Sequence, residues 1–199
     1  MGKEFRHNPI DHIDVKSKMT VSELMSEYSN AGFAAGALSK AVDIYTEMIG
    51  GEDVTNFLSI AGAMVPAGMR KIVTGLIQDG YVDVLVTTGA TLTHDTIEAL
   101  GHNHHHGSSI QRGWGNGNKV REHDEKLRDE GVDRIYDVYL PQEGFAILED
   151  HLRSDVFPSI DREISIREFT TELGRANSEK NEDGDGGIAA TAYECGIPI

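Results

Sequence analysis

Two short apolar runs, each followed by small residues and then by a helical pattern, dominate the distribution of hydrophobic positions. Residues 57–61 lead into the small-residue loop 62–68, and residues 82–86 lead into the loop 87–91. A repeated unit of strand, loop and helix builds a parallel sheet whose loops lie at the carboxyl ends of the strands, where open α/β folds bind ligands. The pattern therefore predicts a Rossmann-like, doubly wound α/β fold, with a mainly parallel sheet and helices on both faces. We expect the strand 82–86 to be buried on both faces.

Helical periodicity separates and follows these strands. One apolar face is formed at helical spacing by Met69, Ile72, Val73, Leu76 and Ile77. Pro66 suits the first turn of this helix, and Gly80 suits its left-handed stop. A further helix is predicted from Thr93 to Gly101, with Asp95 in its first turn, where the helix dipole favours a carboxylate.

Local signals predict helices outside this core as well. Thr20–Glu23 and Ser165–Glu168 both have the capping-box pattern, in which a hydroxyl and a carboxylate satisfy each other's backbone N–H groups. The apolar positions between Leu38 and Ile49 follow helical spacing and predict an amphipathic helix before the first strand. We expect its apolar face to join the core or a subunit interface.

The organisation of the chain follows from these elements. We divide it into a helical segment, residues 1–52, and an α/β domain, residues 53–199. Residues 189–194 predict a short helix stopped by Gly196, and residues 197–199 open another buried strand. A strand cut at its start is an unusual terminus, so we expect an incomplete sheet, from a fragment, a truncated gene product or a half that needs a partner chain.

Charge and composition indicate which ligands the protein can bind and in which cell compartment we expect it. The net charge of −15 argues against a nucleic-acid ligand. It also supports the hypothesis of a halophilic source, under which we expect the folded chain to lose compactness in low salt. No apolar stretch approaches the roughly 20 residues that a membrane span needs. The polar start of the chain has no secretory segment, so we expect a cytoplasmic protein. Cys195 is expected to be a small buried hydrophobe.

The small residues at 61–68, taken alone, fit a dinucleotide site and a close contact between helix and strand equally well. Together with other segments, however, they resemble the deoxyhypusine synthase family, especially its archaeal branch. The segments that carry the resemblance are 31–38, 61–70, 82–90, 93–100, 131–136 with 140–141, 173–174, 189–193 and 197–199. The resemblance therefore touches nearly the whole chain.

The resemblance implies a transferase that uses NAD to oxidise spermidine. Such enzymes hold the aminobutyl group on a lysine as an imine and pass it to a lysine of the hypusine-containing translation factor. The implied NAD-binding residues are Gly62, Ala63, Met64, Val65, Pro66, Thr88, Gly89 and Ala90. The position beside the amine substrate, acidic in some members, corresponds here to His94, next to Asp95. The family also implies a homo-oligomer, expected as a homotetramer.

One family motif is missing from this sequence. The family keeps its nucleophilic lysine in a segment of the form Gly-Gly-Gly-x-x-Lys, and no lysine here follows a run of glycines. We therefore assign no catalytic residue. Three hypotheses stay open: a deoxyhypusine synthase polypeptide without its catalytic half, a polyamine transferase similar to homospermidine synthase, and a non-catalytic paralogue that assembles with a complete subunit.

Two segments contain residue types that bind metal ions in other proteins. His102, His104, His105 and His106 follow the predicted helix that carries His94, and imidazoles can bind zinc or nickel. The mixed ligands of a structural zinc site are missing, so we expect a solvated loop and no resident metal. The run 183–187 has the acidic residues of a calcium loop but no closing glutamate, so we expect an acidic turn.

Overall fold

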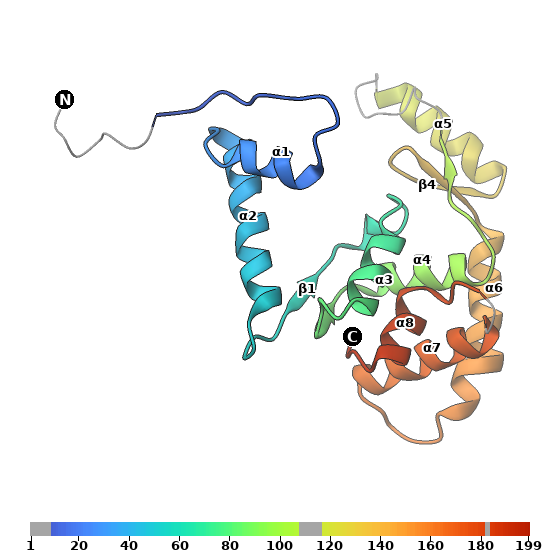
Figure 1. Cartoon of the computed structure of the whole chain (residues 1–199). Coiled ribbons are helices and arrows are strands. Elements are labelled where there is room, and N and C mark those ends of the chain that lie inside the picture. The colour runs from blue at the N-terminus through green and yellow to red at the C-terminus, as the bar shows by residue number, and fades with distance from the viewer. Residues whose placement is uncertain (1–8, 108–116, 182–183) are drawn as a thin grey trace. The chain divides into compact units, whose positions relative to one another are not determined.

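The computed structural model describes residues 9–107, 117–181 and 184–199 (Figure 1). The chain forms two compact units, Met1–Val54 and Thr55–Ile199. The described part of the first unit contains the helices α1 (Val21–Tyr28) and α2 (Phe33–Gly50). The elements of the second unit are, in order, β1 (Phe57–Ser59), the 3₁₀ turn η2 (Gly62–Met64), α3 (Arg70–Gln78), β2 (Val84–Val86), α4 (Gly89–Ala99), β3 (His105–His106), α5 (Gly117–Asp129), β4 (Val132–Ile135), β5 (Val138–Pro141), α6 (Glu143–His151), the π-helical turn η4 (Leu152–Val156), the 3₁₀ turn η5 (Phe157–Ser159), α7 (Ile166–Lys180) and α8 (Gly187–Cys195).

In the first unit, α1 begins at the predicted capping box. The Glu23 N–H donates to Thr20 Oγ1 at 3.2 Å, and the Thr20 N–H donates to Glu23 Oε2 at 2.7 Å. These bonds from the Thr20 backbone and hydroxyl lower the pKa of Glu23. The apolar face of α2 is incompletely covered, because Leu38 and Val42 are 49% and 40% exposed. Burial of these two side chains in a core is therefore not found, and the subunit interface stays a prediction.

In the second unit, β1 and β2 form the expected parallel pair. Phe57 lies opposite Val84, and Leu85 is 1% exposed. Val86 is 48% exposed, so the prediction that this strand is buried on both faces is wrong. The Leu85 N–H donates to the Pro198 carbonyl at 3.0 Å, which places the last residues beside the free edge of β2. This contact is the one expected of a strand at residues 197–199.

A second, antiparallel sheet follows in the order β3-β5-β4. His105 lies opposite Tyr139, and Val132 lies opposite Pro141. The expectation of a solvated histidine loop is therefore wrong for His105, whose backbone is paired, although its side chain is exposed. The structure has an α/β fold with two small sheets in its described residues. The larger, mainly parallel sheet stays a prediction.

The helices between the strands follow the local signals with two shifts. α3 matches the predicted helix, and Gly80, at φ +74°, ends it in the left-handed conformation as expected. Pro66 lies in a turn before α3 and not in its first turn, since the chain winds through η2 and a further turn first. α4 begins at Gly89, four residues before the predicted Thr93, and Asp95 consequently lies in its middle.

The core of the second unit forms where α8 packs against α3, α4 and α7. Figure 1 shows α7 and α8 side by side. Buried apolar residues of the larger cluster are Val65, Val73, Ile77, Val82, Leu85, Ile188 and Ala192. A second cluster contains Val156, Leu173, Ala176 and Ala189. α8 contributes to both clusters, so the position of this short helix determines the packing of the unit.

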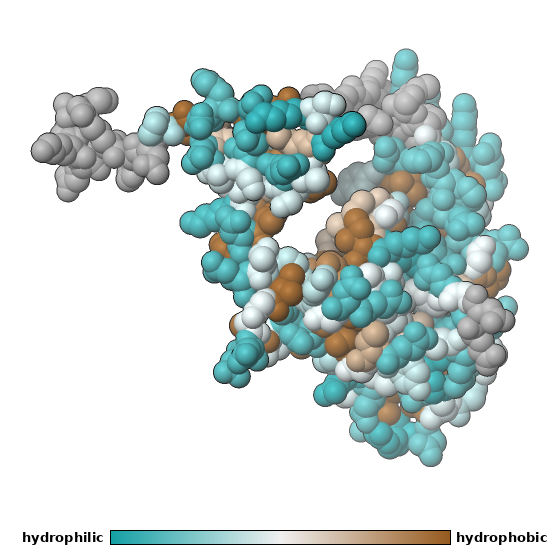
Figure 2. Space-filling model, in the orientation of Figure 1, coloured by the Kyte–Doolittle hydropathy of each residue, from teal (hydrophilic) through white to brown (hydrophobic). Residues whose placement is uncertain are grey.

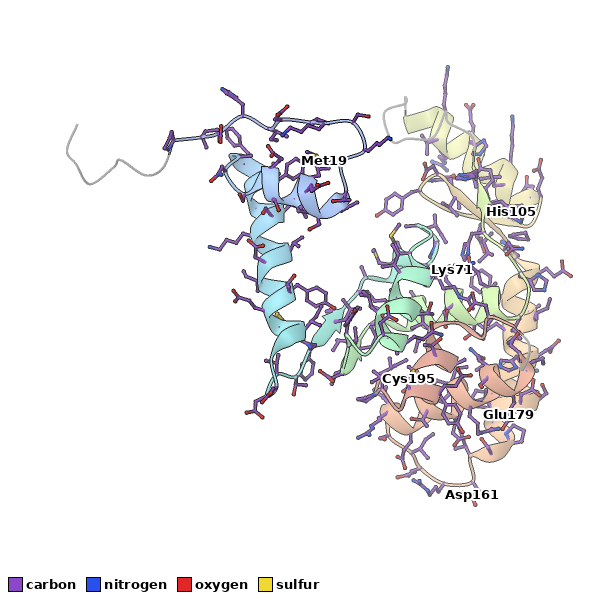
Figure 3. All side chains as sticks on the ribbon, viewed as in Figure 1. Met19, Lys71, His105, Asp161, Glu179 and Cys195 are labelled. Atoms are coloured by element: carbon purple, nitrogen blue, oxygen red, sulfur yellow. The ribbon has the colours of Figure 1, made fainter. Side chains whose placement is uncertain are left out.

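The end of α8 agrees with the sequence only in part. Gly196, at φ +71°, stops the helix in the predicted left-handed conformation. Cys195 is exposed, so its prediction as a buried hydrophobe is wrong. Figure 3 labels Cys195 at the end of α8.

A buried polar link joins α4, α6 and α7. His151 Nε2 lies 2.9 Å from Asn177 Oδ1, and Asn177 Nδ2 donates to Thr96 Oγ1 at 3.1 Å. His151 Nδ1 lies 2.8 Å from Asp155 Oδ2. Lys180 and then His151 hold the pKa of Asp155 well below its usual range. His151, Asn177 and Thr96 are buried and satisfy one another, as buried polar groups in folded proteins do.

Candidate functional site

The two predicted cofactor loops meet at the carboxyl ends of β1 and β2. A Cβ added at Gly62 would lie 2.9 Å from the Ala90 Cβ and 3.0 Å from Thr88 Oγ1. Thr91 Oγ1 donates to the Ala61 carbonyl at 3.3 Å, which ties the start of α4 to the first loop. Parallel pairing brings the loops to one sheet edge, as the sequence predicts, and the absence of a side chain at Gly62 allows their close approach.

Side chains of the first loop divide between the surface and the core. Ala63 and Met64 lie in η2 and are partly buried. Val65 is 1% exposed and belongs to the larger core cluster, and Pro66 is also buried. The sequence predicted these last two residues as part of one contact segment, but in this structure their side chains are buried in the core.

An apolar groove with a volume of about 450 Å³ lies along β2 and the start of α4. It is lined by Val84, Leu85, Val86, Thr87, Thr88, Gly89, Leu92, Ile166, Arg167, Phe169, Thr170, Pro198 and Ile199. The groove thus contains Thr88 and Gly89 from the second predicted cofactor loop. A Cβ added at Gly89 would meet nothing within 4 Å, so a ligand has room to approach the backbone here.

The start of α4 leaves backbone donors available. Thr88 precedes the helix with extended backbone and makes no side-chain capping bond. The first N–H groups of a helix have no partner within the helix, and they attract anionic groups such as phosphates. The groove, the open backbone at Gly89 and the uncapped helix start are features that suit a dinucleotide.

Asp95 is fully buried on α4 and binds groups of the chain itself. Its Oδ1 accepts from Arg70 Nε at 2.8 Å and from the Ile188 N–H at 2.8 Å, and its Oδ2 accepts from the Ala189 N–H at 2.9 Å. Burial raises the pKa of Asp95, while Arg70 and the two N–H groups oppose that rise. Arg70 also pairs with Asp185 at 2.7 Å. Asp95 therefore caps the first turn of α8.

His94 lies next to Asp95 in the sequence but contacts different groups. His94 Nδ1 lies 3.0 Å from His104 Nε2, and His104 Nδ1 lies 2.7 Å from Glu98 Oε1. Burial, followed by the neighbouring His104, lowers the pKa of His94. Sequence reasoning missed His104 as the partner of His94 and Glu98 as the partner of His104. The spacing of four residues from His94 to Glu98 was the available signal, because such residues share a helix face.

Metal ligands do not gather in the described part of the chain. Across residues 9–107, 117–181 and 184–199, no group of three or more His, Cys, Asp or Glu residues is placed to hold a metal ion. Asp183 of the calcium-like run lies outside the described residues, and Asp185 is engaged with Arg70. His105, from the histidine segment considered above as a metal site, lies on β3 and is labelled in Figure 3. Of the helices described, none has both the length and the apolar character that crossing a bilayer requires.

The protein is therefore an α/β protein in which the loops after β1 and β2 meet, and an apolar groove that could hold a ligand lies beside the parallel strand pair. The model of the deoxyhypusine synthase family matches residues 23–199. The chain belongs to the deoxyhypusine synthase family.

Similar proteins agree with this family. A probable deoxyhypusine synthase from Methanosarcina thermophila is 48% identical over 192 residues, which are 96% of this chain and 55% of the relative. The probable deoxyhypusine synthase 1 of Methanosarcina mazei is 46% identical over the same shares of both chains. The chain thus spans about half the length of these curated relatives.

A solved structure shows the same fold. The crystal structure of an Entamoeba histolytica protein assigned to the deoxyhypusine synthases matches with a TM-score of 0.56 and 17% sequence identity. The match covers 96% of this chain and 60% of that one. At this low identity, the match supports the fold alone.

Proposed function

We propose that this chain acts in deoxyhypusine synthesis, the NAD-dependent transfer of the aminobutyl group of spermidine to a specific lysine of the hypusine-containing translation factor. The observation that supports the proposal most strongly is the meeting of the loops 62–66 and 88–90 beside an apolar groove, in a chain of this family. Bound NAD would accept hydride from the amine and later return it. In this proposal, the strand pair is part of a Rossmann-like, mainly parallel sheet.

The roles of the residues follow from their positions. Thr88, Gly89 and Ala90 offer backbone N–H groups at the start of α4 to the phosphates of the cofactor. Gly62 allows the first loop to approach them, and Ala63 and Met64 line the approach from η2. His94 receives the amine substrate, and Asp95 holds α8 in place beneath it.

The nucleophile of the transfer is supplied by residues other than these 199, because none of the lysines of this sequence stands in a Gly-Gly-Gly-x-x-Lys segment. An assembly is therefore part of the proposal, either as a homo-oligomer or with a complete subunit. Exposed apolar side chains support it: Phe57 and Ile72 are 64% and 57% exposed. Figure 2 shows apolar residues interrupting the otherwise hydrophilic visible surface.

Cofactor binding is the first test. Calorimetric titration of the purified chain with NAD is expected to show binding that Gly62→Val abolishes, since the new side chain would fill the contact with Ala90 and Thr88. Gly75→Ala is the matched control, because a Cβ there meets nothing within 4 Å and α3 lies outside the loops. Equal NAD binding by both variants would contradict the assignment of the site.

Turnover is the second test. NAD-dependent cleavage of spermidine is measured with the chain alone and after addition of a full-length relative whose own nucleophilic lysine has been replaced by alanine. We expect no activity in either case, since neither component contains the lysine. We expect activity when the added relative keeps its lysine but has a Gly→Val change in its first cofactor loop, because the chain then supplies the NAD site. Failure of this complementation, together with an absence of NAD binding, would refute the proposal.

A further inference from the structure

Arg70 pairs with three carboxylates that come from two distant parts of the chain. Its Nε lies 2.8 Å from Asp95 Oδ1 and 3.8 Å from Glu98 Oε2, both on α4. Its Nη1 lies 2.7 Å from Asp185 Oδ2, and its Nη2 donates to the Asp185 carbonyl at 3.2 Å. The side chain of Arg70 is only 10% exposed. One buried guanidinium therefore joins α3, α4 and the residues just before α8, three helices that Figure 1 labels.

The place of Arg70 in the chain connects this guanidinium to the first proposed cofactor loop, residues 62–66. Arg70 is the first residue of α3, so the helix begins shortly after the loop ends. The Met69 N–H donates to the Met64 carbonyl at 3.0 Å, which closes the chain between loop and helix into a compact turn. The first loop and Arg70 consequently move as one body.

Asp95 connects the same guanidinium to the second proposed cofactor loop, residues 88–90. This loop forms the start of α4, and Asp95 lies further along that helix. A rigid helix transmits the position of one of its residues to its first turn. The ion pair between Arg70 and Asp95 therefore sets the separation of the two loops.

Asp185 is the outermost member of this cluster. Its side chain is 47% exposed, whereas that of Asp95 is 0% exposed. Asp185 Oδ1 also accepts from the Gly187 N–H at 3.1 Å, and the next N–H, of Ile188, bonds Asp95. A Cβ added at Gly187 would collide with the Arg70 guanidinium, so the glycine allows this close contact. The start of α8 and Arg70 therefore hold each other in place.

We infer that Arg70 is a positioning residue for NAD binding, and that its pairing with Asp185 couples the start of α8 to the two proposed cofactor loops. This inference rests on the proposed function. Arginine suits the role because its planar fork offers donors in several directions, whereas lysine has a single ammonium group. Such a coupling acts in both directions: loss of the Asp185 charge weakens NAD binding, and bound NAD stabilises the start of α8.

NAD affinity is the first readout. Calorimetric titration compares the wild-type chain with Asp185→Asn, which keeps the shape of the side chain and removes its charge. We expect NAD binding to weaken about fivefold, the lower end of measured couplings between sites. Arg70→Lys keeps a positive charge without the fork, and it should weaken binding at least as much. Asp124→Asn is the matched control, because Asp124 is 42% exposed and pairs with Arg134 at 2.6 Å outside α3, α4 and α8. Its NAD affinity should equal that of the wild type.

Hydrogen exchange of backbone amides is the second readout, and it needs no variant. NAD is expected to slow exchange at the Ile188 and Ala189 N–H groups, which bond Asp95. Leu127, buried on α5, reports any stabilisation of the whole fold. We expect the slowing at α8 to exceed that at Leu127 about fivefold, the same factor as for NAD affinity, and the excess to shrink in Asp185→Asn. A purely structural ion pair would give no such excess.

Two results would overturn the inference: a folded Asp185→Asn variant that binds NAD as tightly as the wild type, or NAD that slows exchange at Ile188 and Ala189 no more than at Leu127. Circular dichroism identifies variants that fail to fold, and the exchange measurement on the wild-type chain then decides alone. A wild-type chain that binds no NAD would overturn the proposed function itself, and the inference with it.

Discussion

Replacement of Asp95 by asparagine tests how α8 is held. The carboxylate is 0% exposed and accepts from Arg70 and from the Ile188 and Ala189 N–H groups. Asp95→Asn keeps the shape of the side chain but removes its charge and replaces one oxygen by a donor. At least one of the three donors then loses its acceptor in a fully buried site.

The expected cost follows from these contacts. Breaking a buried ion pair costs about 3–5 kcal/mol, and leaving one buried N–H unsatisfied costs about 1–3 kcal/mol. Arg70 keeps Asp185 at 2.7 Å and Glu98 at 3.8 Å, which reduces the loss. We therefore expect a decrease in the free energy of unfolding of about 3 kcal/mol. In a chain of this size, such a decrease corresponds to a melting temperature roughly 6–12 °C lower.

Thermal unfolding followed by circular dichroism measures this change. Asp150→Asn is the control, since Asp150 is exposed on α6 and its replacement should shift the melting temperature by less than about 2 °C. A similarly small shift in Asp95→Asn would refute the capping role. Such a result, combined with weaker spermidine binding, would favour the substrate contact that the family resemblance implies for Asp95.

Three further predictions follow from the packing and the caps. Gly174→Ala would place a Cβ against the backbone of α8 and should lower the free energy of unfolding by about 2 kcal/mol. Gly75→Ala adds its Cβ in open space within α3 and should raise the free energy of unfolding by about 1 kcal/mol. Urea unfolding of both variants measures these changes. Asn177→Ala removes a fully buried amide that links α6 to α4, and the same assay should show a loss of about 2 kcal/mol. Hydrogen bonds, first from the Ser165 backbone and then from Arg162, lower the pKa of Glu168 from 4.5 to about 2. Because the pKa is lower in the folded chain, the stability that this cap contributes is present above about pH 4.5. It is lost as the pH falls toward 2. NMR titration should show that Ser165→Ala raises the Glu168 pKa, and an unchanged pKa would contradict the cap.

Sequence reasoning succeeded where the signal is contained within one or two helical turns. The capping boxes at Thr20 and Ser165, the helix after the first strand, and the left-handed stops at Gly80 and Gly196 all depend on close neighbours. The parallel pairing of β1 and β2 also follows from the local order of strand, loop and helix. The meeting of the loops that follow β1 and β2 was therefore predictable, because parallel strands end at the same sheet edge.

Contacts between distant residues account for most of what the sequence did not predict. The bond between Asp95 and Ile188 joins residues 93 positions apart, and no local pattern indicates it. The same holds for the pairing of His105 with Tyr139 in the antiparallel sheet. The early start of α4 at Gly89 was missed for a different reason, since Gly, Ala and Thr at its first positions have the composition of a loop.

His94 and Asp95 show how a helix separates neighbours that a motif treats as a pair. Successive residues of an α-helix differ in direction by about 100°, so two adjacent polar side chains cannot face the same environment. Asp95 faces the core, where Arg70 and the start of α8 satisfy it, and His94 faces His104 and Glu98. The family resemblance places both positions beside the substrate, but on the helix Asp95 is fully buried and engaged by the chain itself. The contacts of Asp95 therefore show a structural role, and the binding role stays a proposal for His94.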